Sequence, residues 1–117
     1  MSDALMHALD RISRVRGVRG SMFVAVDDGL VVAQLLMEGV NGKAVAALAA
    51  SLARKVGGAS GAIGAGRVQF AQLAAEGGTL LLASAAHDLL VVALADPNVN
   101  VGLCRLEMVR AAETSVR

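Results

Sequence analysis

Hydrophobic positions along the chain form helical stripes and short apolar runs, and together these patterns predict eight elements. Over residues 3–16, apolar residues recur every three or four positions, as in an amphipathic helix. Short apolar runs then predict strands, with turn signals such as Asp28-Gly29 between them. The predicted strands are 21–26, 30–36, 67–75, 79–85 and 89–95. A last helix over 101–114 completes the series.

The closing helix has a start signal and an apolar side. Asn100 is its predicted N-cap, because an asparagine side chain can accept a hydrogen bond from the first turn. Leu103, Leu106 and Val109 share one side, which we expect to pack on the sheet, with Arg105 turned away from it.

The order of elements is helix, two strands, helix, three strands, helix. The strands carry apolar residues on both faces, so helices must cover both sides of an antiparallel sheet in an α/β (α+β) fold. Strand 67–75 is more polar than the others, which predicts a place at the edge of the sheet. Because 117 residues is the length of one domain, we expect a single domain over 1–117.

The segment 43–66 predicts an alanine-rich helix that ends in glycines. Its larger apolar residues, with Ala49 beside them, define one helical face, which we expect to pack on the core: Val45, Leu48, Leu52 and Val56. The opposite face holds Lys43, Ala47, Ala50, Arg54, Gly58 and Gly61. A helix facing water would carry more polar side chains there, so this flat face predicts a contact outside the chain's own core.

Composition supports burial between chains. Apolar residues make up 56% of the sequence and the mean hydropathy is +0.61, yet only Phe23 and Phe70 are aromatic. Alanine, valine and leucine must therefore build the core. The surplus of apolar residues indicates that some apolar surface is buried between copies or partners.

A membrane span and a nucleic-acid partner are both disfavoured. The most apolar stretch, 79–95, is shorter than the roughly 20 residues that a spanning helix needs and has His87-Asp88 in its middle. Two strands joined by a turn explain it better. The net charge of +1 gives no global attraction to nucleic acid. No signal peptide is visible, and one cysteine, Cys104, fits a reducing cytoplasm, so we expect a cytoplasmic protein.

Candidate chemistry is sparse. Gly42-Lys43 lacks the earlier glycine and the following Ser/Thr of a phosphate-binding loop. His7, His87 and Cys104 have no zinc-site spacing, so we expect no metal, no cofactor and no catalytic residue. Cys104 is predicted to be a packed thiol, although spacing leaves a Cys104–His87 pair open as an alternative.

A basic cluster near the N-terminus has two interpretations. Arg11, Arg14, Arg16 and Arg19 form either a solvated helix face and loop, or a docking patch for an acidic protein or anionic surface. No aromatic residue accompanies them to stack on bases, which again argues against nucleic acid.

Three segments together resemble the roadblock/dynein light chain family. They are the hairpin VAVDDGLVVAQ, the alanine- and leucine-rich helix, and GGTLLLASAAHDLLVVALADPNVNVGLCRLEM. The resemblance implies a five-stranded antiparallel sheet of order 2-1-5-4-3. The middle helix would lie on one face and the terminal helices on the other. It also implies a homodimer that joins its third strands edge to edge and sets its middle helices side by side. One type of bacterial member of the family binds Ras-like small GTPases and can stimulate them, and eukaryotic relatives serve dynein or scaffolds for GTPases.

The resemblance and the flat helix face imply two sets of site residues. The partner interface would use Lys43, Ala47, Ala50, Ser51 and Arg54, and the dimer interface would use Ala47, Ala50, Gly58, Val68, Phe70 and Gln72. The implied function is a homodimeric, non-catalytic regulator or scaffold for a Ras-like small GTPase, which can extend to stimulating GTP hydrolysis. The alternative is an adaptor subunit of a motor, polymer or sensor-kinase assembly with no GTPase contact. An enzyme or ligand sensor is the third class, and no convergent polar constellation supports it.

Overall fold

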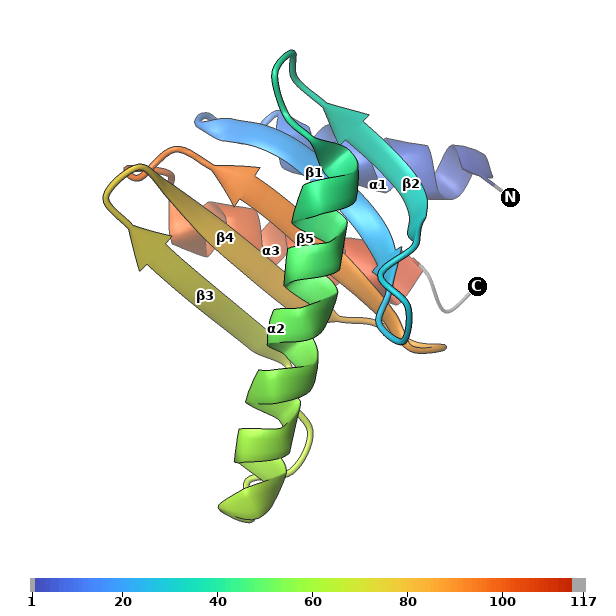
Figure 1. The fold of residues 1–117 in the computed structure, drawn as a ribbon. Coiled ribbons are helices and arrows are strands. Elements are labelled where there is room, and N and C mark those ends of the chain that lie inside the picture. Colours follow the sequence, from blue (N-terminus) through green and yellow to red (C-terminus); the bar gives the residue numbers. More distant parts are fainter. Residues whose placement is uncertain (1, 115–117) are drawn as a thin grey trace.

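The computed structural model describes residues 2–114, and it places one sheet between two helical layers (Figure 1). The elements are α1 (Ser2–Ser13), β1 (Val18–Ala25), β2 (Val31–Leu36), α2 (Gly42–Ala62), β3 (Phe70–Ala75), β4 (Gly78–Ser84), β5 (Leu89–Ala95) and α3 (Val101–Thr114). All eight expected elements occur in the expected order. The bounds of β5 and α3 are as predicted, whereas β3 begins only at Phe70.

The strand order is β2-β1-β5-β4-β3, and all neighbours are antiparallel. This confirms the predicted fold and places β3 at an edge. The β4–β5 connection is the tight turn predicted at His87-Asp88, with both residues in the left-handed region at φ 61° and 56°. The turn closes through the Ala85 amide, which donates to the Leu89 carbonyl at 2.9 Å.

Each face of the sheet has its own core, which confirms the predicted layering (Figure 1). Helices α1 and α3 cover one face and meet the large buried residue Phe23. Helix α2 covers the other face and lies mainly over β2, β1 and β5. Within residues 2–114, no helix combines the length and the apolar character needed to cross a membrane.

The predicted core-facing side of α2 is right for Val45, Ala49 and Leu52 and wrong for Leu48. The buried residues of α2 are Gly42, Ala46, Ala49 and Ala50, while Leu48 is 59% exposed. The cause is the size of the side chains that the sheet sends toward α2: Met22, Val24, Leu80, Leu82, Leu90 and Val92. Because these residues fill the layer, only small side chains fit directly beneath the helix.

The prediction for α3 is wrong in the same way. Its buried residues are Cys104, Met108 and Ala111, which recur at helical spacing. The three residues expected to pack on the sheet are 42% to 46% exposed: Leu103, Leu106 and Val109. These branched side chains of α3 therefore point away from the core, and the unbranched Met108 fills it together with Cys104 and Ala111.

Candidate protein-interaction surface

The outer surface of α2 displays most of the predicted partner residues. The helix starts at Asn41, whose Oδ1 accepts a hydrogen bond from the Ala44 amide at 3.1 Å. From this start, Lys43 and Ala47 are exposed and Ser51 is half-buried. These side chains are available to a partner.

Ala50 is not available. It is 1% exposed and lies beneath the helix, close to the turn at Gly29. Gly29 has φ 73°, and a Cβ there would stand 3.3 Å from the Cα of Ala47, so the β1–β2 turn packs tightly under α2. The prediction that Ala50 offers a side chain to either interface is therefore wrong.

Arg54 is exposed as expected, but its side chain also makes a structural contact within the chain. Its Nη1 donates to the backbone carbonyl of Val26 at 2.6 Å and lies 3.5 Å from that of Asp27. The guanidinium therefore ties α2 to the loop after β1. This contact orients Arg54 in the isolated chain, whatever partner it meets.

Two exposed residues on the outward face of α2 were not predicted. Leu48 and Lys55 follow Ala44 and Ser51 at spacings of four, three and four, so the four residues form one stripe. The sequence holds a signal for this stripe. Gly42, Ala46, Ala49 and Ala53 repeat at the same spacing on the other side, which is the pattern of a helix that approaches a sheet closely.

The C-terminal half of α2 extends past the sheet (Figure 1). Gly58 and Gly61 are exposed there, and Ile63, which caps the helix, is 80% exposed. A glycine inside a helix costs about 1 kcal/mol relative to alanine. This end therefore gains little stability from its own sequence or from the chain's own core.

The predicted dimer residues near β3 lie on different sides of the sheet. Phe70 is half-buried on the α3 side, and Gln72 is exposed at the free edge. Val68 lines a small cavity on the α2 side together with Ala53 and Val56. These residues share an edge of the molecule and no single face.

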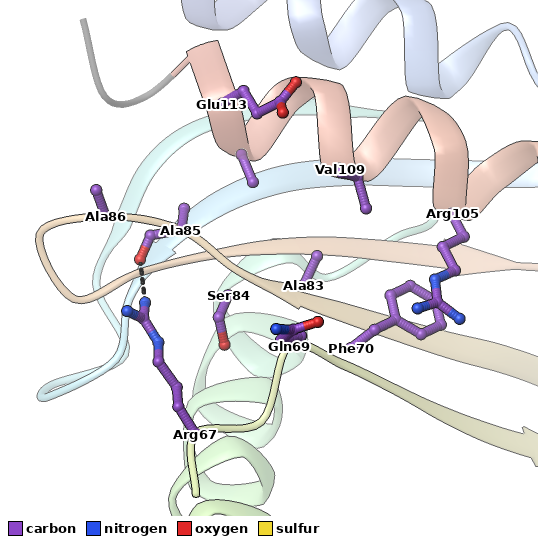
Figure 2. A pocket seen from close by; sticks show the side chains of 11 residues that line it. Arg67, Gln69, Phe70, Ala83, Ser84, Ala85, Ala86, Arg105, Val109 and Glu113 are labelled. Atoms are coloured by element: carbon purple, nitrogen blue, oxygen red, sulfur yellow. Dashed lines mark hydrogen bonds between the residues drawn. The ribbon is translucent and has the colours of Figure 1, made fainter.

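A pocket of about 400 Å³ lies on the α3 side of this edge (Figure 2). Arg67, from the segment before β3, donates from Nη2 to the Ala85 carbonyl at 2.9 Å. Arg105, from α3, lies with its guanidinium carbon 4.8 Å from the centre of the Phe70 ring. Glu113 is the carboxylate among the lining residues. Sequence reasoning missed this pocket because its two arginines come from distant segments.

Comparison with known proteins identifies the family. A model of the Roadblock/LC7 domain matches residues 6–95, which is most of the chain. The chain belongs to the Roadblock/LC7 domain family. An uncharacterized protein of Methanocaldococcus jannaschii is 36% identical over 102 residues, covering 87% of this chain and 88% of that protein.

Solved structures share the fold of this roadblock domain. MglB of Myxococcus xanthus superposes with a TM-score of 0.85 at 17% identity, covering 97% of this chain and 92% of that chain. A structure described as MglB with tetrameric arrangement gives a TM-score of 0.82 at 24% identity, covering 93% of this chain and 82% of that chain. The family and the fold are those of a small regulatory or scaffold domain.

The basic cluster of this roadblock domain is partly paired within the chain. Arg14 contacts Asp10 at 2.9 Å, and Arg11 lies 3.8 Å from Glu107, while Arg16 and Arg19 are exposed. The exposed Arg14–Asp10 pair contributes little stability. Both interpretations of the cluster, a solvated face and a docking patch, stay predictions.

Cys104 is the packed thiol that the sequence predicts. It is fully buried in α3, 3.8 Å from the sulfur of Met108, and burial raises the pKa of its thiol to about 11. His87 is exposed in the β4–β5 turn. A buried, protonated thiol is a poor nucleophile, so the structure does not support a Cys104–His87 pair.

Proposed function

We propose that this roadblock domain is a homodimeric, non-catalytic regulator or scaffold that holds a Ras-like small GTPase on paired α2 helices. The family and fold support a regulatory or scaffold role, and the family resemblance implies the GTPase partner and the homodimer. The single cysteine favours a cytoplasmic location. No cofactor is needed for this role. Lys43, Ala47, Ser51 and Arg54 are the proposed partner contacts.

The observation that carries the proposal is the outward stripe of α2. Leu48 is 59% exposed among alanine and serine side chains. One exposed leucine is ordinary, but this one lies on a helix whose glycine-containing end has no sheet beneath it (Figure 1). A second α2 packed alongside would bury Leu48 and support that end, because small side chains allow two helices to approach closely.

Pairing would also create a platform. In a twofold dimer the same patch appears twice, so Lys43 and Arg54 of each copy would flank one continuous surface. The predicted dimer residues Ala47 and Gly58 are exposed on the same helix, and β3 of each copy would lie at the adjoining edge. A GTPase could contact residues from both copies at once.

The first test is the oligomeric state, measured by sedimentation at micromolar concentration. We expect a dimer for the natural sequence and a dissociation constant about 10- to 100-fold higher for Leu48→Arg, because a charge would enter an apolar contact. Leu106→Arg is the matched control: it is 46% exposed on α3, on the other side of the sheet. A monomeric natural protein would overturn the proposal.

The second test is nucleotide-dependent binding to the Ras-like GTPases of the same organism. We expect the dimer to bind one of them with different affinity in its GTP-analogue and GDP forms, and Lys43→Glu to weaken binding without changing the dimer. The rate at which phosphate is released from GTP, measured with and without the dimer, shows whether hydrolysis is stimulated. A stable dimer that binds none of these GTPases would favour the adaptor function instead.

A further inference from the structure

The free edge of β3 offers a defined set of backbone groups. The Ser84 amide donates to the Gln69 carbonyl at 3.1 Å, and the pairing then runs on to Ala75 opposite Gly78. In an antiparallel ladder, hydrogen-bonding residues alternate with residues whose groups point the other way. Residues 69, 71, 73 and 75 therefore bond toward β4. Phe70, Gln72 and Ala74 turn their N–H and C=O groups to the open edge.

The pocket beside this edge is positively charged. Arg67 and Arg105 are each held in place, the first by the Ala85 carbonyl and the second by the Phe70 ring (Figure 2). Within residues 2–114, neither guanidinium forms an ion pair. The pocket lining therefore carries two positive charges and one negative charge, that of Glu113. A second carboxylate at the strand edge would balance the charge.

We propose that a second copy of this chain pairs its β3 with this edge in the register centred on Gln72, and that the partner's Glu76 supplies that carboxylate. The inference rests on the proposed homodimer and specifies its register. Gln72 would stand opposite the partner's Gln72, and Phe70 opposite the partner's Ala74. All three outward residues of each strand then pair.

The neighbouring registers pair fewer groups. Opposite residues in an antiparallel ladder point to the same face of the sheet. The two nearest registers that keep this rule are therefore centred on Ala71 and on Leu73. Each of these shifts leaves one of the three outward residues facing a segment outside the partner's strand. Burial of an unpaired backbone group at an interface is unfavourable, which favours the centred register.

The centred register brings the partner's Glu76 to the pocket. Glu76 follows β3 directly, is exposed, and forms no ion pair within residues 2–114. In this register the partner's Glu76 lies opposite Val68 and diagonal to Phe70. Diagonal neighbours are about 7–8 Å apart, within reach of long side chains. Because Arg105 lies over the Phe70 ring, it is the nearest cation, and the twofold axis repeats the contact.

A charge exchange tests the ion pair. In sedimentation at low salt, we expect Glu76→Arg and Arg105→Glu each to raise the dimer dissociation constant about 10-fold or more, since like charges would meet twice per dimer. The double variant Glu76→Arg/Arg105→Glu restores the opposite charges and should return to within about 3-fold of the natural protein. Glu38→Arg and Arg19→Glu are control reversals at exposed positions away from β3. Circular dichroism verifies that each variant is folded.

Disulfide trapping tests the register independently. Directly opposite Cα atoms of a hydrogen-bonded pair are about 5.5 Å apart, which a disulfide can span, whereas a pair offset by two residues is not spanned. We expect Gln72→Cys to give a covalent dimer on oxidation and Leu73→Cys to give little. Cys104 can stay in place because it is buried.

The outcomes separate the two proposals. A monomeric natural protein would overturn the homodimer itself. If the natural protein is a stable dimer, three results would overturn this register and ion pair while the homodimer stands. Both single reversals could dimerise as tightly as the natural protein, or the double variant could dimerise no more tightly than the single reversals. Leu73→Cys could also give the covalent dimer in place of Gln72→Cys.

Discussion

The two faces of the sheet build their cores in different ways. On the α1/α3 side both layers supply bulky side chains, Leu9 and Ile12 from α1 and Phe23 from the sheet, and the small strand residues Ala83 and Ala93 also belong to this core. On the α2 side the sheet supplies the bulk, with Leu82 among its members, and the helix contributes alanines. Both layers are closely packed, but the helices and the sheet contribute different shares of the buried side-chain volume in each.

This difference explains why α2 leaves apolar surface exposed. A helix that fits on the sheet with alanines must place its leucines at its flanks or outside, as Leu48 shows. Helix α1 instead turns its largest residues inward and its charged residues outward. The two layers should therefore respond differently to the same kind of substitution.

The largest expected effect is a truncation in the α1 layer. Leu9 is fully buried, so Leu9→Ala should lower the free energy of unfolding by about 2–5 kcal/mol, through lost transfer energy and a cavity. Urea denaturation measures the loss. The matched control is Leu103→Ala, because Leu103 is 45% exposed in the same helical layer. If both variants lower the free energy of unfolding equally, the large buried side chain of Leu9 does not contribute specially to this core.

An enlargement should be costly in the α2 layer. Ala49 is fully buried against large sheet residues, so Ala49→Leu should lower the free energy of unfolding by about 1–3 kcal/mol through overpacking. Ala44→Leu, at an exposed position of the same helix, should change it by less than about 0.5 kcal/mol. Urea denaturation of both variants is the measurement. An Ala49→Leu variant as stable as the natural protein would contradict the tight fit beneath α2.

The sequence predicts local structure well because the signals are local, whereas the strand order came from the family resemblance. Asp28-Gly29 and His87-Asp88 mark turns, and the Asn100 side chain caps α3 by accepting from the Leu103 amide at 3.0 Å. The polar character of β3 also identifies an edge strand correctly.

The side of each helix that faces the sheet is predicted less well, because it depends on the size of the side chains that the sheet directs toward the helix. Residue size suggested that Leu48 and Leu106 face inward, but the sheet's own side chains decide that question. For the candidate site, Lys43 and Arg54 reach the surface as expected and Ala50 does not. The pocket needs tertiary structure, since no pattern in the chain brings Arg67 and Arg105 into the lining of one pocket.

Alkaline pH gives a smaller, selective test of the α3 layer. The pKa of the Cys104 thiol is about 11 in the folded protein against an ordinary value of 9.0, because burial disfavours the thiolate. The unfolded chain therefore releases the proton first as pH rises, so this group's contribution to stability is present below pH 9 and lost between pH 9 and 11.

The measurement is the free energy of unfolding across that pH range. We expect the natural protein to lose about 1–2 kcal/mol more than Cys104→Ala does, since the variant has no thiol to titrate. Comparing the two slopes removes the contribution of lysines and arginines common to both. Parallel slopes would mean that the thiol is reached by water in solution.

The smallest expected effect compares the two helix caps, which lie on opposite faces of the sheet. The Asn41 and Asn100 side chains accept from the Ala44 and Leu103 amides at 3.1 and 3.0 Å, so the local bonds are nearly the same. Asn41→Ala and Asn100→Ala should each lower the free energy of unfolding by about 1 kcal/mol, because each leaves amides of the first turn without this acceptor. Asn→Asp at either position retains the acceptor and adds charge at a helix N-terminus, so it should be neutral or stabilising. If Asn41→Ala costs much less in urea denaturation, the start of α2 unfolds before the sheet does. The two layers would then differ in their coupling to the sheet as well as in packing, and α2 would depend on its proposed second copy for order along its whole length.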